Sequence, residues 1–202
     1  MELIPLITLE KRKIIETNQK TTDTKEINQV NEDEKIYVLD KDGIVKDKPN
    51  LCLFQSASGS YGLWVDSGPV DLGDVVDSFM AGATAITIRK NMWNNLDIEN
   101  IREITENEIF FEIDLRDIDE INNKIHLIEK ADGIVLFNEK KLIELDSKYT
   151  NFLKQLCNKI KIYAYETNSE NIFYWENKGI TGLLVNIKKI KEFRTKWQLK
   201  LK

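Results

Sequence analysis

The chain has 202 residues, of which 42% are hydrophobic and 31% are charged, and its net charge is −5. This composition is typical of a folded globular protein and excludes an intrinsically disordered one. The acidic balance argues against general nucleic-acid binding, which needs a basic surface that displaces counterions. Two cysteines and one histidine exclude a disulfide framework, a four-ligand zinc site and most histidine-based catalysis.

The first residues contain a short apolar run and no basic segment before a long apolar stretch, so no secretory signal is predicted. No apolar run approaches the ~18 residues that a membrane span needs. We therefore expect a cytoplasmic protein with no membrane partner.

Short apolar runs that end in polar residues recur along the chain and predict strands at 3–8, 35–40, 62–66, 84–89, 108–114, 132–138, 161–166 and 182–186. From the second run onward, their polar ends follow one another at intervals of 20 to 28 residues. Such an interval accommodates one strand, two short loops and one helix. Between the first two runs lies a polar stretch, residues 17–35, which predicts an extended first loop with a frayed helix around 23–33.

Several segments between the runs have helical spacing of apolar residues. Asp71 and Asp74 precede one of them in the manner of a capped helix start. The predicted apolar stripes are Val75, Val76, Phe79 and Met80; Ile118, Ile121, Ile125 and Ile128; Leu142, Leu145, Phe152, Leu153 and Leu156; and Ile187, Ile190, Phe193, Trp197 and Leu201.

Alternating strands and helices predict parallel strands with right-handed crossovers, and eight such units make a (β/α)8 barrel, the TIM barrel fold. The chain lies near the lower limit of about 200 residues for this fold, so we expect one domain over residues 1–202 with few insertions. An open doubly wound sheet is the alternative. An open sheet would need a glycine-rich phosphate-binding turn after the first strand, and no such turn follows Thr8, where that strand is predicted to end.

Four stretches carry a family resemblance. They are Ile4–Leu9, Tyr37–Ile44, Trp64–Ile88 and Ile113–Arg116. They resemble the first to fifth strands of the ribotide isomerase of histidine biosynthesis, ProFAR isomerase. Divergent sequences of this kind occur in methane-producing archaea and methylotrophic bacteria, which implies a link to one-carbon, methanopterin-type cofactor metabolism.

The resemblance implies an Amadori-type rearrangement of an aminoaldose phosphate by two aspartates that face each other across the barrel mouth. Asp114 matches the aspartate of the fifth strand, whereas Thr8 occupies the position of the other, and a hydroxyl cannot replace a carboxylate there. The family's glycine-rich phosphate turns are also changed, for example at Asp66 and Glu166, whose carboxylates would repel phosphate. The original isomerase activity is therefore not expected.

Barrel active sites lie at the C-terminal ends of the strands. Asp114 is predicted there as a general base, or as a relic paired with a cation. Glu112 is expected one layer deeper in the barrel, where its carboxylate needs a cation beside it; Arg89 is the first expected partner and Lys41 the second. Glu112 is predicted either as an acid in catalysis or as half of a buried ion pair. We predict Asp114, Glu112 and Asp66 as catalytic residues and Thr8, Asp40, Arg89, Arg116, Ser67, Gly68, Glu166 and Asn186 as ligand-binding residues.

The acidic strand ends, the single histidine and the two cysteines have simpler interpretations than metal binding or catalysis. Asp40, Asp42 and Asp66 with Asp114 could hold a divalent cation, but strand-end carboxylates also cap helices, so neither a metal nor an organic cofactor is predicted. His126 is interpreted as a surface or helix-packing residue, and Cys52 and Cys157 as small buried apolar groups.

The segment from Lys188 to Lys202 carries a local charge of +6, a pattern that could recruit a nucleic acid or an acidic partner. The apolar stripe from Ile187 to Trp197 favours instead a last barrel helix with a solvated lysine face, and homodimerisation stays open. Two functional hypotheses remain. In the first, a small anionic or polyhydroxylated metabolite, a class that includes phosphorylated ones, binds at the barrel mouth, with isomerase- or lyase-type proton transfer by Asp114. In the second, the barrel has no activity and serves assembly or regulation. The two differ in whether Phe110, Tyr163, Tyr165 or Trp64 plugs the mouth, or a pocket lies beside Arg89 or Arg116.

Overall fold

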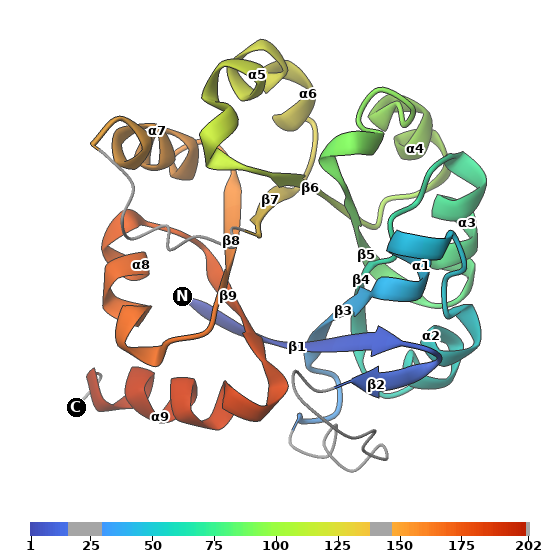
Figure 1. Ribbon diagram of the computed structural model, residues 1–202, viewed down its shortest axis with the longest axis horizontal. Coiled ribbons are helices and arrows are strands. Elements are labelled where there is room, and N and C mark those ends of the chain that lie inside the picture. Colours follow the sequence, from blue (N-terminus) through green and yellow to red (C-terminus); the bar gives the residue numbers. More distant parts are fainter. Residues whose placement is uncertain (16–29, 138–146, 201–202) are drawn as a thin grey trace. The chain divides into compact units, whose positions relative to one another are not determined.

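The computed structural model describes residues 1–15, 30–137 and 147–200 (Figure 1). The chain divides into two compact units. The N-terminal unit comprises Pro5–Ile109, and the C-terminal unit comprises Met1–Ile4 with Phe110–Lys202.

The strand order is β2-β1-β3-β4-β5-β6-β7-β8-β9, with an additional pairing of β1 with β9. Strands β1, β3, β4 and β5 pair in parallel, as do β6, β7, β8 and β9, and from β3 onward helices lie between successive strands. This is the (β/α)8 barrel fold class, and the fold predicted from the sequence is confirmed.

The N-terminal unit alternates strands and helices after an initial hairpin. Its elements are β1 (Glu2–Glu10, from Pro5), β2 (Lys13–Ile15), β3 (Lys35–Asp40), α1 (Lys41–Lys46), α2 (Leu51–Ala57), β4 (Gly62–Asp66), α3 (Leu72–Met80), β5 (Ala83–Ile88), the 3-10 turn η2 (Lys90–Met92), α4 (Ile98–Ile104) and β6 (Glu108–Ile113, to Ile109). The β1–β2 hairpin is antiparallel, with Glu10 paired to Lys13.

The C-terminal unit repeats the same alternation. Its elements are the rest of β6, the 3-10 turn η3 (Leu115–Asp117), α5 (Ile118–Asn123), α6 (Ile125–Ile128), β7 (Gly133–Leu136), α7 (Ser147–Cys157), β8 (Lys161–Glu166), η5 (Ser169–Asn171), α8 (Ile172–Lys178), β9 (Gly182–Asn186), η6 (Ile187–Lys189) and α9 (Ile190–Lys200). Phe110 packs edge-on against Tyr163 with ring centroids 5.6 Å apart, and both rings are buried. Gly133 makes room for this pair, because a Cβ there would lie 2.8 Å from the Phe110 ring.

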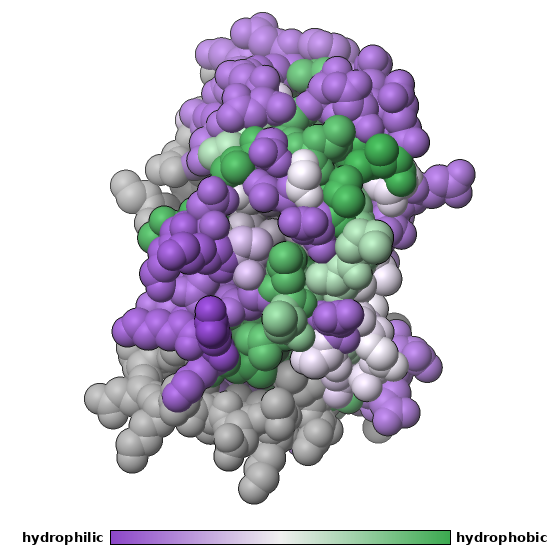
Figure 2. Space-filling view, turned by 90° about the vertical axis from the view of Figure 1, so that its right-hand side faces the viewer, coloured by the Kyte–Doolittle hydropathy of each residue, from purple (hydrophilic) through white to green (hydrophobic). Residues whose placement is uncertain are grey.

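The predicted helix starts and stripes are largely confirmed. Asp71 caps α3 in a reciprocal arrangement, since its side chain accepts from the Asp74 amide while the Asp74 side chain accepts from the Asp71 amide. Val75 is buried, but Val76 and Met80 are 37% and 79% exposed, so the apolar stripe of α3 is narrower than predicted. Hydrophobic side chains interrupt the hydrophilic surface on the face of the molecule shown in Figure 2.

The other stripes lie on α5 to α9, where their buried members are Ile118, Ile121, Ile128, Phe152, Leu153, Leu156, Ile187, Ile190 and Phe193. Ile125 and Trp197 are half-buried. Leu142, Leu145 and Leu201 lie outside the described residues, as do Asn138 and most of the loop predicted at 17–35.

The bounds of β3, β4, β8 and β9 equal the predicted ones, whereas β2 is absent from the prediction. His126 is exposed on α6, as expected for a surface residue. The prediction for Cys52 is wrong, because its side chain is exposed on α2. Cys157 is half-buried, and burial raises the pKa of its thiol to about 11. Within the described ranges, no helix has both the length and the apolar character of a membrane span.

Candidate functional site

A hydrogen-bonded cluster joins β3, β4 and β5 of the N-terminal unit near their C-terminal ends. Register pairs Tyr37 with Trp64, and side chains alternate along each strand, so Asp66, Thr87 and Arg89 follow on the same side. The Tyr37 hydroxyl lies 3.0 Å from Asp66 Oδ2 and 3.2 Å from Thr87 Oγ1. The indole Nε1 of Trp64 donates to Thr87 Oγ1 at 2.9 Å.

Arg89 binds Asp66 with two nitrogens. Its Nε donates to Asp66 Oδ1 at 3.0 Å and its Nη2 donates to Oδ2 at 2.8 Å. The Asp66 side chain has no exposed surface, whereas the Arg89 side chain is 23% exposed. The two-point contact fixes the plane of the guanidinium, which therefore keeps one orientation at the strand ends.

Burial, and secondarily the negative charge of Asp66, raise the pKa of Tyr37 well above its ordinary value. The phenol is therefore neutral in the folded protein, and its hydroxyl donates a hydrogen bond to the carboxylate. Asp66 thus accepts three hydrogen bonds, two from Arg89 and one from Tyr37. This arrangement suits a carboxylate that orients Arg89 better than one that carries out the predicted proton transfer.

A second polar cluster lies where β3 passes into α1. Asp40 is buried and accepts from the backbone and side-chain amides of Asn50, both at 2.7 Å, and from the backbone amides of Asp42 and Gly43. Burial raises the pKa of Asp40 despite these bonds. Asp42 behaves oppositely, because the hydrogen bond from Lys46 at 2.6 Å lowers its pKa to about 2. Asp40 thus caps α1 and, through Asn50, fixes the loop that follows this helix.

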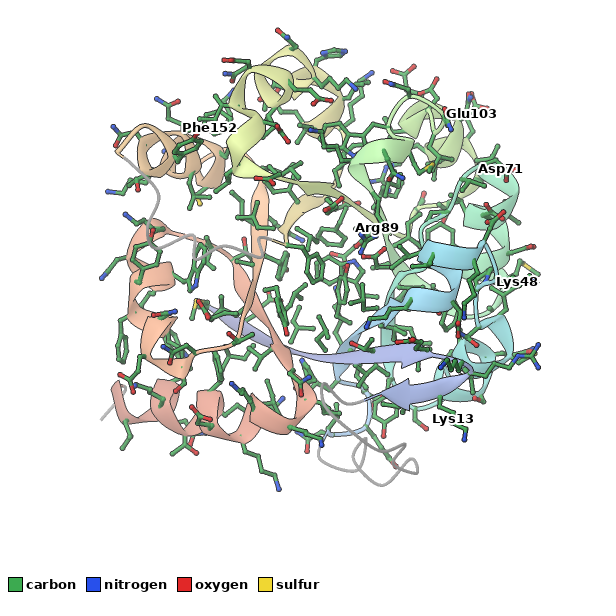
Figure 3. The ribbon with its side chains drawn as sticks, in the orientation of Figure 1. Lys13, Lys48, Asp71, Arg89, Glu103 and Phe152 are labelled. Atoms are coloured by element: carbon green, nitrogen blue, oxygen red, sulfur yellow. The ribbon has the colours of Figure 1, made fainter. Side chains whose placement is uncertain are left out.

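A cavity of about 330 Å³ opens at this end of the strands, and Arg89, Asn91, Lys46 and Gly68 are among its lining residues. Gly68 has a φ of 68°, a conformation that glycine adopts without strain. Figure 3 shows Arg89 on the inner side of the strands. The volume is at the lower end of the range for small-molecule sites.

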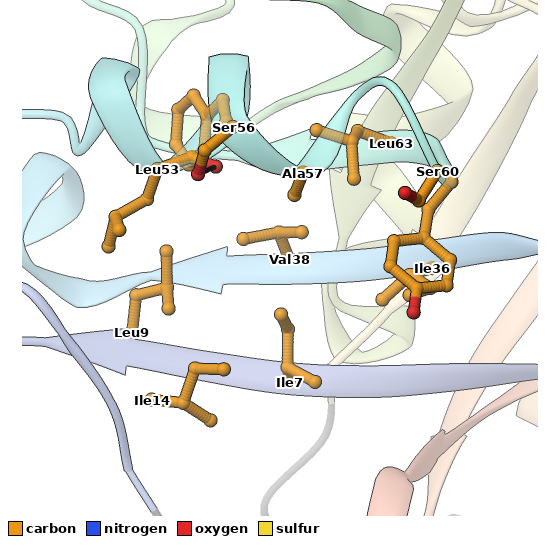
Figure 4. Close-up of a pocket in the computed structure, with 12 residues that line it drawn as sticks. Ile7, Leu9, Ile14, Ile36, Val38, Leu53, Ser56, Ala57, Ser60 and Leu63 are labelled. Atoms are coloured by element: carbon orange, nitrogen blue, oxygen red, sulfur yellow. Dashed lines mark hydrogen bonds between the residues drawn. The ribbon is translucent and has the colours of Figure 1, made fainter. Parts of the chain in front are cut away.

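A second, apolar pocket of about 230 Å³ lies between α2 and strands β1 and β3 (Figure 4). Ile7, Val38 and Leu53 line it from the three elements. It contains no charged side chain, so it cannot orient a polar ligand and is interpreted as imperfect packing beneath α2.

The predicted ligand residues of the N-terminal unit divide by location. Arg89 and Gly68 line the 330 Å³ cavity. Ser67 is buried, and its hydroxyl lies 3.4 Å from that of Ser78 on α3. Thr8 is half-buried within β1 and pairs with Leu39.

The remaining predicted residues belong to the C-terminal unit. Glu112 and Asp114 are both half-buried, at the end of β6 and just after it. Glu166 accepts from the amides of Thr167 and Asn168 and from Asn171 and Trp175, whose indole Nε1 is 2.8 Å away. Glu166 therefore anchors the start of α8. Asn186 accepts from the amide of Lys188, which makes it the cap of η6, and the side chain of Arg116 lies outside the described residues.

Arg89 and Lys41, the cations predicted as partners of Glu112, each have a contact within the N-terminal unit, and their pairing with Glu112 stays a prediction. Arg89 is bound to Asp66, and Lys41 Nζ is 3.5 Å from Glu10. In the part of the chain that the structure describes, no three His, Cys, Asp or Glu side chains are grouped so that they could hold a metal ion. Asp40, Asp42 and Asp66 are accordingly not gathered into one such group.

Sequence reasoning missed Tyr37 and Thr87 as members of the cluster. The alternation of side chains along a strand was the available signal for Thr87, which lies two residues before Arg89. Tyr37 had no such signal, because only the strand register, which pairs it with Trp64, brings it to the side of Asp66. No protein-family model matches the chain, and no curated protein does.

Proposed function

We propose that this (β/α)8 barrel binds a small anionic or polyhydroxylated metabolite in the cavity at the C-terminal ends of β3, β4 and β5. The observation that carries the proposal is that Arg89, held at two points by the buried Asp66, lines this cavity. A guanidinium fixed in this way offers hydrogen bonds of defined direction without an entropic cost of ordering on binding.

The charges define the ligand class further. Asp66 neutralises much of the charge of Arg89, and Asp42 does the same for Lys46, which also lines the cavity. Electrostatic attraction for a doubly charged anion is therefore weaker than two free cations would give. Directional hydrogen bonding to hydroxyl or carboxylate oxygens is the interaction that remains, which favours a sugar-like or singly charged ligand.

Kinship with the ribotide isomerases, and a one-carbon metabolic setting, belong to the same proposal. If the barrel is catalytic, Asp114 is the general base of an isomerase- or lyase-type proton transfer, because it follows β6 directly, where barrel enzymes carry such groups. Glu112 would assist it, whereas Asp66 would orient Arg89.

A thermal-shift screen of sugar phosphates, sugar acids and pterin precursors tests the proposal, since a ligand stabilises the native state as its concentration exceeds its dissociation constant. We expect stabilisation of the wild type that is lost in Arg89→Lys, which keeps the charge but not the two-point geometry. Arg102→Lys is the matched control, because Arg102 does not line the cavity and donates to the backbone carbonyl of Asn107, in the loop that follows α4. Equal stabilisation of wild type and Arg89→Lys would exclude Arg89 as the contact.

The alternative is a barrel without catalysis that serves assembly or regulation. It is favoured by the closed character of the cluster, in which Trp64 and Tyr37 are fully buried and Asp66 has no exposed surface. Absence of any stabilising compound, with Asp114→Asn and wild type indistinguishable in every assay, would favour this alternative.

A further inference from the structure

A groove of about 720 Å³ lies between the turn of the β1–β2 hairpin and the loop that joins α1 to α2. The residues that line it are Lys11, Arg12, Asp42, Lys46, Lys48, Pro49, Asn50, Leu51, Cys52 and Leu53. It shares only Lys46 with the cavity beside Arg89. In Figure 3, Lys48 lies on the outer side of α1, away from Arg89 on the inner side of the strands.

The groove has an excess of positive charge. Four cations and one carboxylate line it, although the whole chain has a net charge of −5. Lys46 is paired with the carboxylate of Asp42 at 2.6 Å. The side chains of Lys11, Arg12 and Lys48 are exposed and have no hydrogen-bond or ion-pair partner among residues 1–15, 30–137 and 147–200. Three cations therefore face one concave surface without compensating charge.

Two of these cations, Lys11 and Arg12, lie in a turn whose backbone conformation is energetically unfavourable for them. Lys11 and Arg12 have φ values of 54° and 60°, a region in which side chains with a Cβ are strained and in which hairpin turns favour Asn and Gly. The Arg12 amide donates to Asp42 Oδ2 at 3.1 Å, which ties the turn to α1. Side chains held in this backbone region cluster at functional sites, so the turn supports a functional role for this surface.

The other side chains of the groove are apolar. Pro49, Leu51 and Leu53 are half-buried and lie next to the basic residues along the loop and the first turns of α2. A bare inorganic anion would not use these contacts, whereas a ligand with an apolar body would bury them. The volume is within the range of small-molecule sites.

We propose that this groove binds an organic anion, a phosphate or carboxylate attached to an aromatic or aliphatic body, with the charged group at Lys11, Arg12 and Lys48 and the body on Pro49, Leu51 and Leu53. The groove shares Lys46 with the cavity proposed for the metabolite, but none of the residues assigned here to the organic anion lines that cavity. It neither needs nor supports the assignment of Arg89.

Cys52 provides the readout, because its thiol is exposed and lines the groove. Its reaction with 4,4′-dithiodipyridine forms a mixed disulfide and releases one 4-thiopyridone, which is measured by absorbance. Cys157 reacts slowly, since it is half-buried and its pKa is raised to about 11. Phenyl phosphate and inorganic phosphate are the two probes, and the change in amide resonances of Lys11, Arg12 and Lys48 is a second readout that does not depend on access to the thiol.

We expect phenyl phosphate to slow the reaction of Cys52 at a concentration about tenfold lower than inorganic phosphate requires, because only phenyl phosphate covers the apolar residues. In Lys11→Gln/Lys48→Gln, protection should need about tenfold more phenyl phosphate. Lys154→Gln/Lys191→Gln removes the same charge from exposed positions on α7 and α9 and should behave as the wild type.

The local potential is tested with the same thiol and an anionic reagent. The ratio of the Cys52 rate with 5,5′-dithiobis(2-nitrobenzoate) to that with the neutral disulfide should fall several-fold in Lys11→Gln/Lys48→Gln and at high salt, and not in the control variant. Equal protection of wild type and groove variant, equal potency of the two phosphates, or no effect of phenyl phosphate on both thiol and amide signals would each overturn the proposal. Circular dichroism and melting temperature check that the variants are folded.

Discussion

Asp66→Asn removes the charge that holds Arg89 in the strand-end cluster while preserving the size of the side chain. The carboxylate accepts two hydrogen bonds from Arg89, at 3.0 and 2.8 Å, and one from Tyr37 at 3.0 Å. An asparagine retains one oxygen acceptor and turns an amide donor toward groups that are themselves donors. At least one of the three bonds is lost, and the guanidinium is left without its counter-charge.

The free energy of unfolding should fall by about 3 kcal/mol, the lower end of the range for breaking a buried ion pair by removing one partner. The lower end applies because the Arg89 side chain is 23% exposed, so water can replace part of the lost interaction. For a chain of this length each kcal/mol shifts the melting temperature by roughly 2–4 °C, which gives a decrease of about 6–12 °C.

Urea unfolding followed by tryptophan fluorescence, together with calorimetry, measures both quantities. Asp71→Asn is the matched control, since Asp71 is an exposed helix cap and asparagine is an equally good cap, so its stability should be unchanged. A loss below about 1 kcal/mol in Asp66→Asn would refute the reasoning, because that is the value of an ordinary neutral hydrogen bond.

Three further outcomes are expected. Gly43→Ala should destabilise the protein by more than about 2 kcal/mol in chemical denaturation, because the new Cβ would lie 2.4 Å from a backbone oxygen of the loop after β4; Gly59→Ala, with nothing within 4 Å, should not. NMR titration should give Asp42 a pKa of about 2, and Lys46→Gln should return it toward 3.8. Since this pKa is lowered on folding, the stability that depends on it is present above pH 4 and is lost as the pH falls toward 2, a loss that should be smaller in Lys46→Gln. Ala57→Leu should fill part of the apolar pocket and raise stability by about 0.5–1 kcal/mol in urea unfolding.

The strands were predictable because each is a short apolar run bounded by polar residues, a pattern that changes little with context. β3 and β9 begin and end at the predicted residues. β2 was not predictable in this way, because three residues, Lys13–Ile15, give no periodicity and the preceding turn has Lys11 and Arg12 where a hairpin signal would have Asn-Gly.

The candidate site was predictable only in part. Asp66 and Arg89 were both expected at strand ends, but their contact depends on strand register, which spacing along the chain does not give. The basic groove is further from prediction, because it joins residues at 11–12 to residues at 46–48 through one backbone hydrogen bond from Arg12 to Asp42. Neither short segment has a motif of its own.

Each unit contains an almost entirely buried tryptophan whose indole N–H donates a hydrogen bond. Trp64 donates to Thr87 in the N-terminal unit, and Trp175 donates to Glu166 in the C-terminal unit. Such protons exchange with deuterium when the surrounding structure opens, so their two rates report the opening of each unit separately. Rates that agree across denaturant concentrations would mean that both units unfold in one cooperative step, and rates that diverge would identify the unit that yields first.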